Sequence, residues 1–252
     1  MTDTGMHKMQ RLFSGFLLGL ALTFAPAAMA SSEGLPASNA NLSDLGSLQN
    51  GAKIYFNYCS GCHSLSLMRY SRIAEDLRLS QEQVMQNLNF TPANFGDRIP
   101  PSINAADGKA WFGVAPPDLS LMARAKGVDY VYNYLKSFYL DSSRPIGWNN
   151  TAFPNAAMPN ALWELQGVQT ARFKPVEGGN PGEFEGFDLH QAGKLNPEEF
   201  DGVARDVANF LQYAAEPAAM QRKSIGIWVI VFLAVFTLIA YFLKQEYWKD
   251  VH

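Results

Sequence analysis

Two cysteines and a histidine stand together in the sequence as Cys59-Ser60-Gly61-Cys62-His63. This C-x-x-C-H spacing is typical of c-type haem attachment. In a helical segment, two thiols at this spacing can add to the two vinyl groups of one haem, and His63 then lies under the iron as its fifth ligand. Because the chain has only 2 cysteines, we expect one covalent haem c, and we exclude a multi-bridge disulfide framework and a four-cysteine metal cluster.

A thioredoxin-like redox pair is the main alternative for a C-x-x-C sequence. That alternative is disfavoured because no alternation of strands and helices surrounds Cys59 and Cys62. A C-x-x-C-H sequence can also occur by chance in a cytosolic protein. That alternative is disfavoured because residues 1–30 resemble an export signal, and haem is attached on the side of the membrane to which such a signal directs the chain.

The sixth ligand has to come from elsewhere in the chain. His190 lies in an acidic, Gly-rich stretch typical of an exposed loop, so we expect a methionine sulfur instead. The candidates in the body of the chain are Met85, Met122 and Met158. Distance along the sequence favours Met122, whereas the proline-stiffened run 153–159 (FPNAAMP) favours Met158. We choose Met158 as the ligand and expect Met122 to be a packing residue.

The elements that must position these residues are helical. Apolar residues recur at three- and four-residue intervals over 45–58, 81–90, 130–140 and 198–215. No convincing strand series is present, and residues 91–118, 141–160 and 175–197 are rich in Gly, Pro and Asn, as loops are. We therefore expect a mainly α fold: a c-type cytochrome domain with long loop insertions, in which something other than side chains fills the core, plus one C-terminal transmembrane helix.

Both ends of the chain are apolar. Residues 13–25 follow Lys8 and Arg11 and precede an Ala-x-Ala triplet, which predicts a signal peptide over residues 1–30 with cleavage after Ala30. An uncleaved N-terminal anchor is the alternative. Residues 224–243 carry no charge, and 20 residues at about 1.5 Å each span the roughly 30 Å hydrocarbon core of a membrane.

The domain organisation follows from these ends. We expect an exported haem c domain over 31–218, a transmembrane anchor over 224–243 and a cytoplasmic tail over 244–252. Basic residues flank the anchor equally, so the signal peptide sets the orientation. This predicts a single-pass protein of a bacterial-type inner membrane, with the haem domain on the periplasmic side.

Charge restricts the partners. The net charge is −3, which disfavours nucleic-acid binding because that requires a basic face. One region near the end of the body contains many carboxylates, and its basic residues are Lys194 and Arg205. Its negative charge would attract a cationic partner. Its members are Glu177, Glu183, Glu185, Asp188, Glu198, Glu199, Asp201 and Asp206. A merely solvated acidic loop is the alternative.

Several segments in a fixed order give the chain a family resemblance from about Leu45 to Trp248. They are residues 47–51 before the C-x-x-C-H motif, 115–120 (APPDLS), 124–126 (RAK), 129–132 (DYVY), 157–159 (AMP), 206–211 (DVANFL) and 215–217 (AEP). Together they resemble the cytochrome c1 family, the haem c subunits of cytochrome bc1 complexes.

The resemblance implies roles for single residues. It implies thioether links at Cys59 and Cys62, with His63 and Met158 as the fifth and sixth iron ligands. It also implies that Pro117 lies against the haem and that Arg124 and Tyr130 contact the propionates. The chain has Lys126 where many relatives have a second arginine, so a bidentate contact there is not expected. The extra disulfide of some relatives is not possible with two cysteines.

A function is implied as well. With both axial positions filled by protein atoms, the iron has no place for a substrate, so the chain would be an electron carrier without a substrate site of its own. The family implies partners: cytochrome b, a Rieske iron–sulfur protein as donor, and cytochrome c or an equivalent acceptor, in a dimeric complex. One alternative is a membrane-anchored c-type cytochrome that donates electrons to a terminal oxidase. Another is a haem enzyme or gas sensor with an open sixth position.

Overall fold

The computed structural model describes residues 34–174 and 182–249, of which about 49% are helical. The expected signal peptide, Glu177 and His252 lie outside these residues. The helices are α2 (Leu45–Ile54), α3 (Tyr70–Asp76), α4 (Gln81–Asn87), α5 (Ala105–Phe112), α6 (Met122–Lys126), α7 (Val128–Lys136), α8 (Trp163–Gln166), α9 (Pro197–Ala215) and α10 (Ala219–Tyr247). A π-helical turn, η1 (Tyr55–Cys59), continues α2. The four helices expected from periodicity are all present, although the third ends at Lys136 and continues as a strand.

The expectation that strands are absent was wrong. The described chain contains three two-stranded antiparallel sheets: β1 (Leu65–Arg69) with β2 (Arg98–Ile99), β3 (Phe138–Leu140) with β4 (Trp148–Asn150), and β5 (Gly167–Phe173) with β6 (Phe184–Ala192). Strand β6, which lies in one of the expected loops, was missed because it is almost wholly exposed. A strand shows the alternation of apolar and polar residues only where one of its faces is buried.

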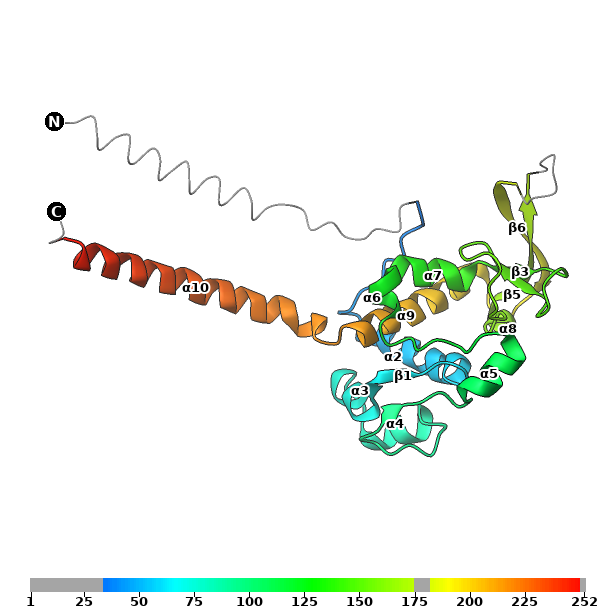
Figure 1. Ribbon diagram of the computed structural model, residues 1–252, viewed down its shortest axis with the longest axis horizontal. Helices are drawn as coiled ribbons and strands as arrows, with labels where there is room; N and C mark the ends of the chain where they lie inside the picture. Colours follow the sequence, from blue (N-terminus) through cyan, green and yellow to red (C-terminus); the bar gives the residue numbers. More distant parts are fainter. Residues whose placement is uncertain (1–33, 175–181, 250–252) are drawn as a thin grey trace. The chain divides into compact units, whose positions relative to one another are not determined.

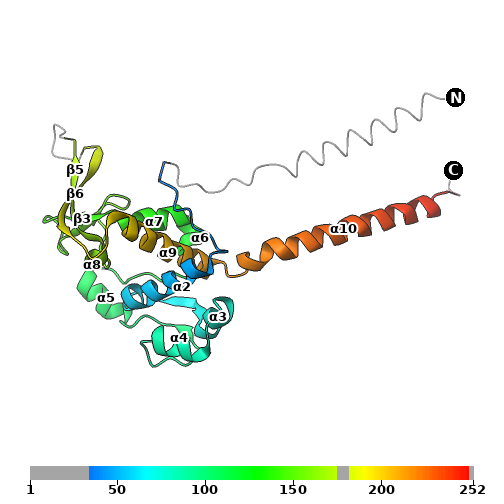
Figure 2. The ribbon, with the colours of Figure 1, turned by 180° about the vertical axis from the view of Figure 1, so that it is seen from behind.

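Helix α9 forms the centre of the core. Its N-terminus is fixed by a capping box between Asn196 and Glu199, with Pro197 at the first helical position. Its buried residues include Phe200, Val207 and Leu211. Helices α2, α6 and α7 all contact α9, and both ribbon views show α2 and α7 beside it (Figures 1 and 2).

Helix α2 approaches α9 very closely at Gly51. A Cβ atom added to Gly51 would lie 2.0 Å from the Asp206 carbonyl oxygen and 2.8 Å from the Phe210 Cβ. The approach is secured by polar contacts, because the Asp206 carboxylate accepts hydrogen bonds from Ser47 Oγ (2.7 Å) and Asn50 Nδ2 (2.6 Å). Glycine is therefore required here by the close approach of two backbones.

Gly51→Ala should lower the free energy of unfolding by about 1–3 kcal/mol, because α2 has to move away from α9. The measurement is denaturant titration of the detergent-solubilised protein. Gly46→Ala on the same helix is the matched control, since its added Cβ would meet only Asp44 Oδ1 at 3.4 Å. We expect its stability to stay within about 1 kcal/mol of the parent. Equal losses in the two variants would contradict a steric role for Gly51.

The π-helical turn delivers the cysteine motif to the core. Ser60 N–H donates to the Tyr55 carbonyl, five residues back, and the Tyr55 hydroxyl donates to the His63 carbonyl at 2.9 Å. A π-turn inserts an extra residue into the helix and is found often at functional sites. Here it ends at Cys59, the first residue of the motif.

Helix α10 follows α9 after a short break. Within residues 34–174 and 182–249 it is the one helix long and apolar enough to cross a membrane, and the window that qualifies it has no buried residues. It runs beyond the expected 224–243 at both ends.

Candidate functional site

Two adjoining cavities, of about 220 and 260 Å³, open beside the cysteine motif. Both are lined by Cys59, His63, Pro117, Tyr134, Phe153 and Met158, so we treat them as two lobes of one central cavity. Cys62, Phe112, Val114 and Pro116 belong to the first lobe, whereas Leu119, Met122, Lys126, Tyr130, Val207 and Leu211 belong to the second. The walls are predominantly apolar, as in most cofactor sites.

The imidazole of His63 is held in one tautomer. Its Nδ1 lies 2.7 Å from the Pro117 carbonyl oxygen. Because a carbonyl can only accept, Nδ1 carries the proton and Nε2 keeps a free lone pair, as a metal ligand requires. Burial lowers the pKa of His63, although the Pro117 hydrogen bond and the Asp118 carboxylate oppose that shift. The ring is therefore neutral at neutral pH.

The segment that carries Pro117 is tied to the motif through Asp118. Its carboxylate accepts hydrogen bonds from Ser64 Oγ (2.5 Å) and the backbone N–H groups of Ser66 (2.7 Å) and Ser120 (2.9 Å). Burial would raise the pKa of Asp118, but these hydrogen bonds outweigh it and hold the pKa at about 2. The carboxylate thus stays ionised and keeps the Pro117 carbonyl against His63.

The two cysteines do not have the properties of a redox pair. Both are free thiols. Burial, with a smaller contribution from Cys62, raises the pKa of Cys59 to about 12, and burial also raises the pKa of Cys62. Redox-active C-x-x-C pairs instead depend on a lowered thiol pKa. This finding disfavours the thioredoxin-like alternative.

Of the three candidate methionines, Met158 and Met122 reach the central cavity. Met158 lines both lobes together with the motif, and Met122, at the start of α6, lines only the second. Met85 packs against the core from α4 and lies on neither lobe. His190 is exposed on β6. The donor set that meets at the cavity is therefore two thiols, one imidazole nitrogen and a thioether, which fits a covalently bound haem.

Two buried asparagines hold the segment that carries Met158, which we call the Met158 loop (residues 151–159). Asn149 Oδ1 accepts from the Asn155 N–H at 2.8 Å, and Asn150 Oδ1 accepts from the Phe153 N–H at 3.1 Å. Asn150 is completely buried. The stiffness of this loop was expected from its prolines, and the asparagines were missed. Their signal was an Asn-Asn pair before the loop, which is typical of side chains that bond nearby backbone.

Of the three residues considered for propionate contacts, two line the central cavity and one does not. Tyr130 and Lys126 line the second lobe, and the Lys126 ammonium lies 5.9 Å from the centre of the Tyr130 ring. The side chain of Arg124 is exposed on α6 and lies on neither lobe. Tyr134, which contacts both lobes from α7, was not singled out from the sequence.

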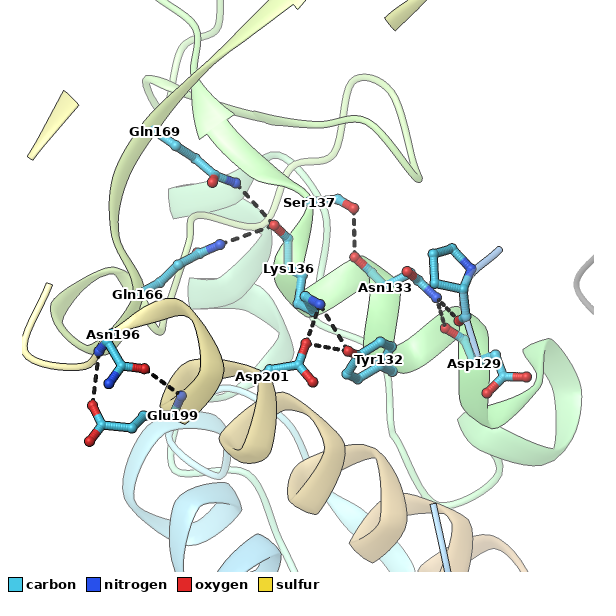
Figure 3. Close-up of polar contacts among 11 residues, drawn as sticks. Asp129, Tyr132, Asn133, Lys136, Ser137, Gln166, Gln169, Asn196, Glu199 and Asp201 are labelled. Atoms are coloured by element: carbon cyan, nitrogen blue, oxygen red, sulfur yellow. Dashed lines mark hydrogen bonds and ion pairs between the residues drawn. The ribbon is translucent and has the colours of Figure 1, made fainter. Parts of the chain in front are cut away.

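The acidic region has more internal partners than the sequence suggested. Of the members that the structure describes, three form ion pairs: Glu183 with Lys174 (2.5 Å), Asp188 with Arg172 (2.5 Å), and Asp201 with Lys136. Figure 3 shows the last of these, together with Tyr132, and the Glu199 cap on α9. Of the basic partners, Arg172 lies on β5, Lys174 directly follows β5 and Lys136 ends α7, and none of them was counted from the sequence. The unpaired negative charge available to a cationic partner is correspondingly smaller.

Comparisons with known proteins show the family of this chain. The profile of the Cytochrome C1 family matches residues 38–171 and 184–251. A cytochrome c1 of Allochromatium vinosum is 47% identical over 94% of this chain and 98% of its own length. A protein of Nitrosomonas europaea named ammonia monooxygenase gamma subunit is 38% identical over 83% of this chain and 85% of its own length. A cytochrome b/c1 of Bradyrhizobium diazoefficiens is 26% identical over 83% of this chain and 34% of its own length.

Proposed function

Because this chain belongs to the cytochrome c1 family, we propose that it is the haem c subunit of a quinol–cytochrome c oxidoreductase and passes single electrons. The observation that carries the proposal is the central cavity, where Cys59, His63 and Met158 line both lobes and Cys62 lines the first. In this proposal Cys59 and Cys62 would bind one haem c covalently, and His63 and Met158 would be its iron ligands.

Each of these residues has a defined task. The thiols of Cys59 and Cys62 would hold the haem, each by adding its sulfur and hydrogen across one vinyl double bond, which needs no oxidant. His63 presents its free Nε2 lone pair because Pro117 occupies Nδ1. The thioether of Met158 favours Fe(II) and raises the reduction potential, and the apolar walls limit the access of water. Haem c itself supplies one-electron exchange at its iron.

The proposed electron route has a donor and an acceptor outside this chain. Electrons arrive from a Rieske iron–sulfur protein and leave to cytochrome c or an equivalent carrier, in a dimeric complex with cytochrome b. The name of the Bradyrhizobium relative, cytochrome b/c1, supports the association with cytochrome b. Tyr130 and Lys126, which line the second lobe, would hold the propionates, and Arg124 would reach them only if its exposed side chain turned inward.

We place the protein in the inner membrane of a bacterium. Helix α10 is its anchor, the haem domain is periplasmic and residues 244–252 are cytoplasmic. The support is the apolar character of α10 together with the signal-like residues 1–30.

Purification of the complex tests this function. The tagged chain, extracted in mild detergent, should bring with it a b-type cytochrome and an iron–sulfur protein, and the preparation should oxidise quinol. A partner set consisting of a terminal oxidase would favour the alternative carrier function. Recovery with an ammonia-oxidising enzyme would favour the function named for the Nitrosomonas relative. Ready binding of carbon monoxide to the reduced protein would indicate an open sixth position.

Removal of residues 224–252, with the signal peptide kept, should release a soluble haem domain that still accepts and donates electrons. The reason is that every proposed ligand precedes α10. Cell fractionation followed by haem staining measures the effect, with the full-length chain as the membrane-bound control. Membrane retention of the shortened chain would show that another segment anchors it, such as an uncleaved helix over residues 13–30.

A further inference from the structure

We propose that the hydroxyl of Tyr134 donates a hydrogen bond to the sulfur of Met158 and thereby raises the reduction potential of the haem. The inference rests on the proposed function, because it needs Met158 as an iron ligand. It gives Tyr134 a positioning and tuning role that neither the motif nor the family resemblance assigned.

The geometry that carries this inference is a direct contact. The Tyr134 Oη lies 3.6 Å from the Met158 Sδ, within the range for the large sulfur atom. A thioether sulfur has two lone pairs, so one can bind iron while the other accepts from the hydroxyl. Within the described residues the Tyr134 hydroxyl has no other hydrogen-bond acceptor.

The contact is held from both sides by one buried residue. Asn150 Nδ2 donates to the Tyr134 carbonyl at 2.8 Å, while Asn150 Oδ1 accepts from the Phe153 N–H in the Met158 loop. The Tyr134 ring itself is packed edge-on against Phe138, with ring centres 5.1 Å apart. The backbone of Tyr134 and the start of the loop are therefore joined through a single side chain, which limits how far hydroxyl and sulfur can separate.

The sign of the effect follows from the charges. A hydrogen bond to the sulfur reduces the electron density that the sulfur donates to the iron. The positive end of the hydroxyl dipole also points toward the sulfur and the iron behind it. Both effects disfavour Fe(III), which carries one more positive charge than Fe(II). Because the cavity walls are apolar, these interactions are poorly screened. Tyr134 should therefore raise the potential, and its loss should lower it.

Tyr134→Phe in the intact complex tests the inference, since it removes the hydroxyl and keeps the ring. We expect normal haem staining and a retained sulfur-to-iron charge-transfer band in the oxidised protein. The equilibrium between reduced and oxidised haem should shift about threefold toward the oxidised form. For a one-electron couple this is a fall of about 28 mV in the reduction potential. Redox titration of the haem absorbance measures this shift.

Tyr132→Phe is the matched control. It removes a hydroxyl from the same helix that contacts Lys136 and Asp201 (Figure 3) and does not line the cavity. We expect lower stability and an unchanged potential. An unchanged potential in Tyr134→Phe, or the same shift in both variants, would overturn the inference. So would loss of the charge-transfer band in Tyr134→Phe, because Tyr134 would then act only by packing.

Failure of the inference is distinguishable from failure of the ligand assignment. If Met158→Leu abolishes the charge-transfer band while Tyr134→Phe leaves the potential unchanged, Met158 is the ligand and only the tuning role is wrong. If the band survives in Met158→Leu, the ligand assignment fails and the inference fails with it.

Discussion

His63→Ala should leave the chain without normally attached haem and with a poorly folded body. The variant removes the imidazole that Pro117 and Asp118 hold in place, and the apolar central cavity then loses the large group that fills it. Cys59→Ala and Cys62→Ala should have similar effects because each removes one thioether link. Haem-stained electrophoresis of membranes is the measurement, and quinol oxidation should fall to background.

The control for this prediction is His190→Ala. His190 is exposed on β6, so its loss should leave haem staining and quinol oxidation unchanged. A haem band of full strength in His63→Ala, with quinol oxidation at the parent level, would contradict the assignment of His63 as the fifth ligand.

Met158→Leu should lower the reduction potential sharply while disturbing the fold little. Leucine keeps an apolar side chain of similar volume, so the packing cost should be below about 1.5 kcal/mol. The thioether is lost, and with it the preference for Fe(II). We expect a fall of at least about 0.1 V, well inside the roughly 0.8 V range that axial ligands cover. That fall corresponds to about fifty-fold in the electron-transfer equilibrium, so quinol-driven reduction should fail.

Met122→Leu is the matched comparison because Met122 also lies on the cavity wall. It should cause only local repacking, with the charge-transfer band and potential retained. If Met122→Leu removes the band while Met158→Leu leaves it intact, the ligand assignment is wrong, and distance along the sequence was the better guide.

The body helices that could be predicted, α2, α4, α7 and α9, carry apolar residues at helical spacing in the local sequence. Helix α9 carries both its start signal, Asn196-Pro197, and its apolar stripe in the local sequence. The hairpin of β5 and β6 could not be predicted in the same way. Strand β6 is largely exposed, and the cross-strand pairs of the hairpin, such as Arg172 with Asp188, depend on a register that the sequence does not display.

In the candidate site, too, the residues marked by local sequence could be predicted, and those that depend on contacts between distant segments could not. Cys59, Cys62 and His63 form a contiguous motif, and Met158 lies in a recognisable loop, so local sequence was sufficient to propose them. Tyr134 could not be found, because its importance depends on a contact with a residue 24 positions away. The propionate role of Arg124 came from the resemblance alone, and the structure leaves that side chain outside the cavity.

The residues that line the central cavity come from segments spread along most of the sequence of the domain. They begin with the motif after η1, continue through the Pro117 segment, α7 and the Met158 loop, and end with Val207 and Leu211 on α9. A chain made from its N-terminus therefore presents the cysteines long before the last wall exists. Closing such distant contacts is entropically costly and slow. Haem joined early to Cys59 and Cys62 would give the later segments an apolar surface on which to assemble, so order of synthesis and order of folding would coincide.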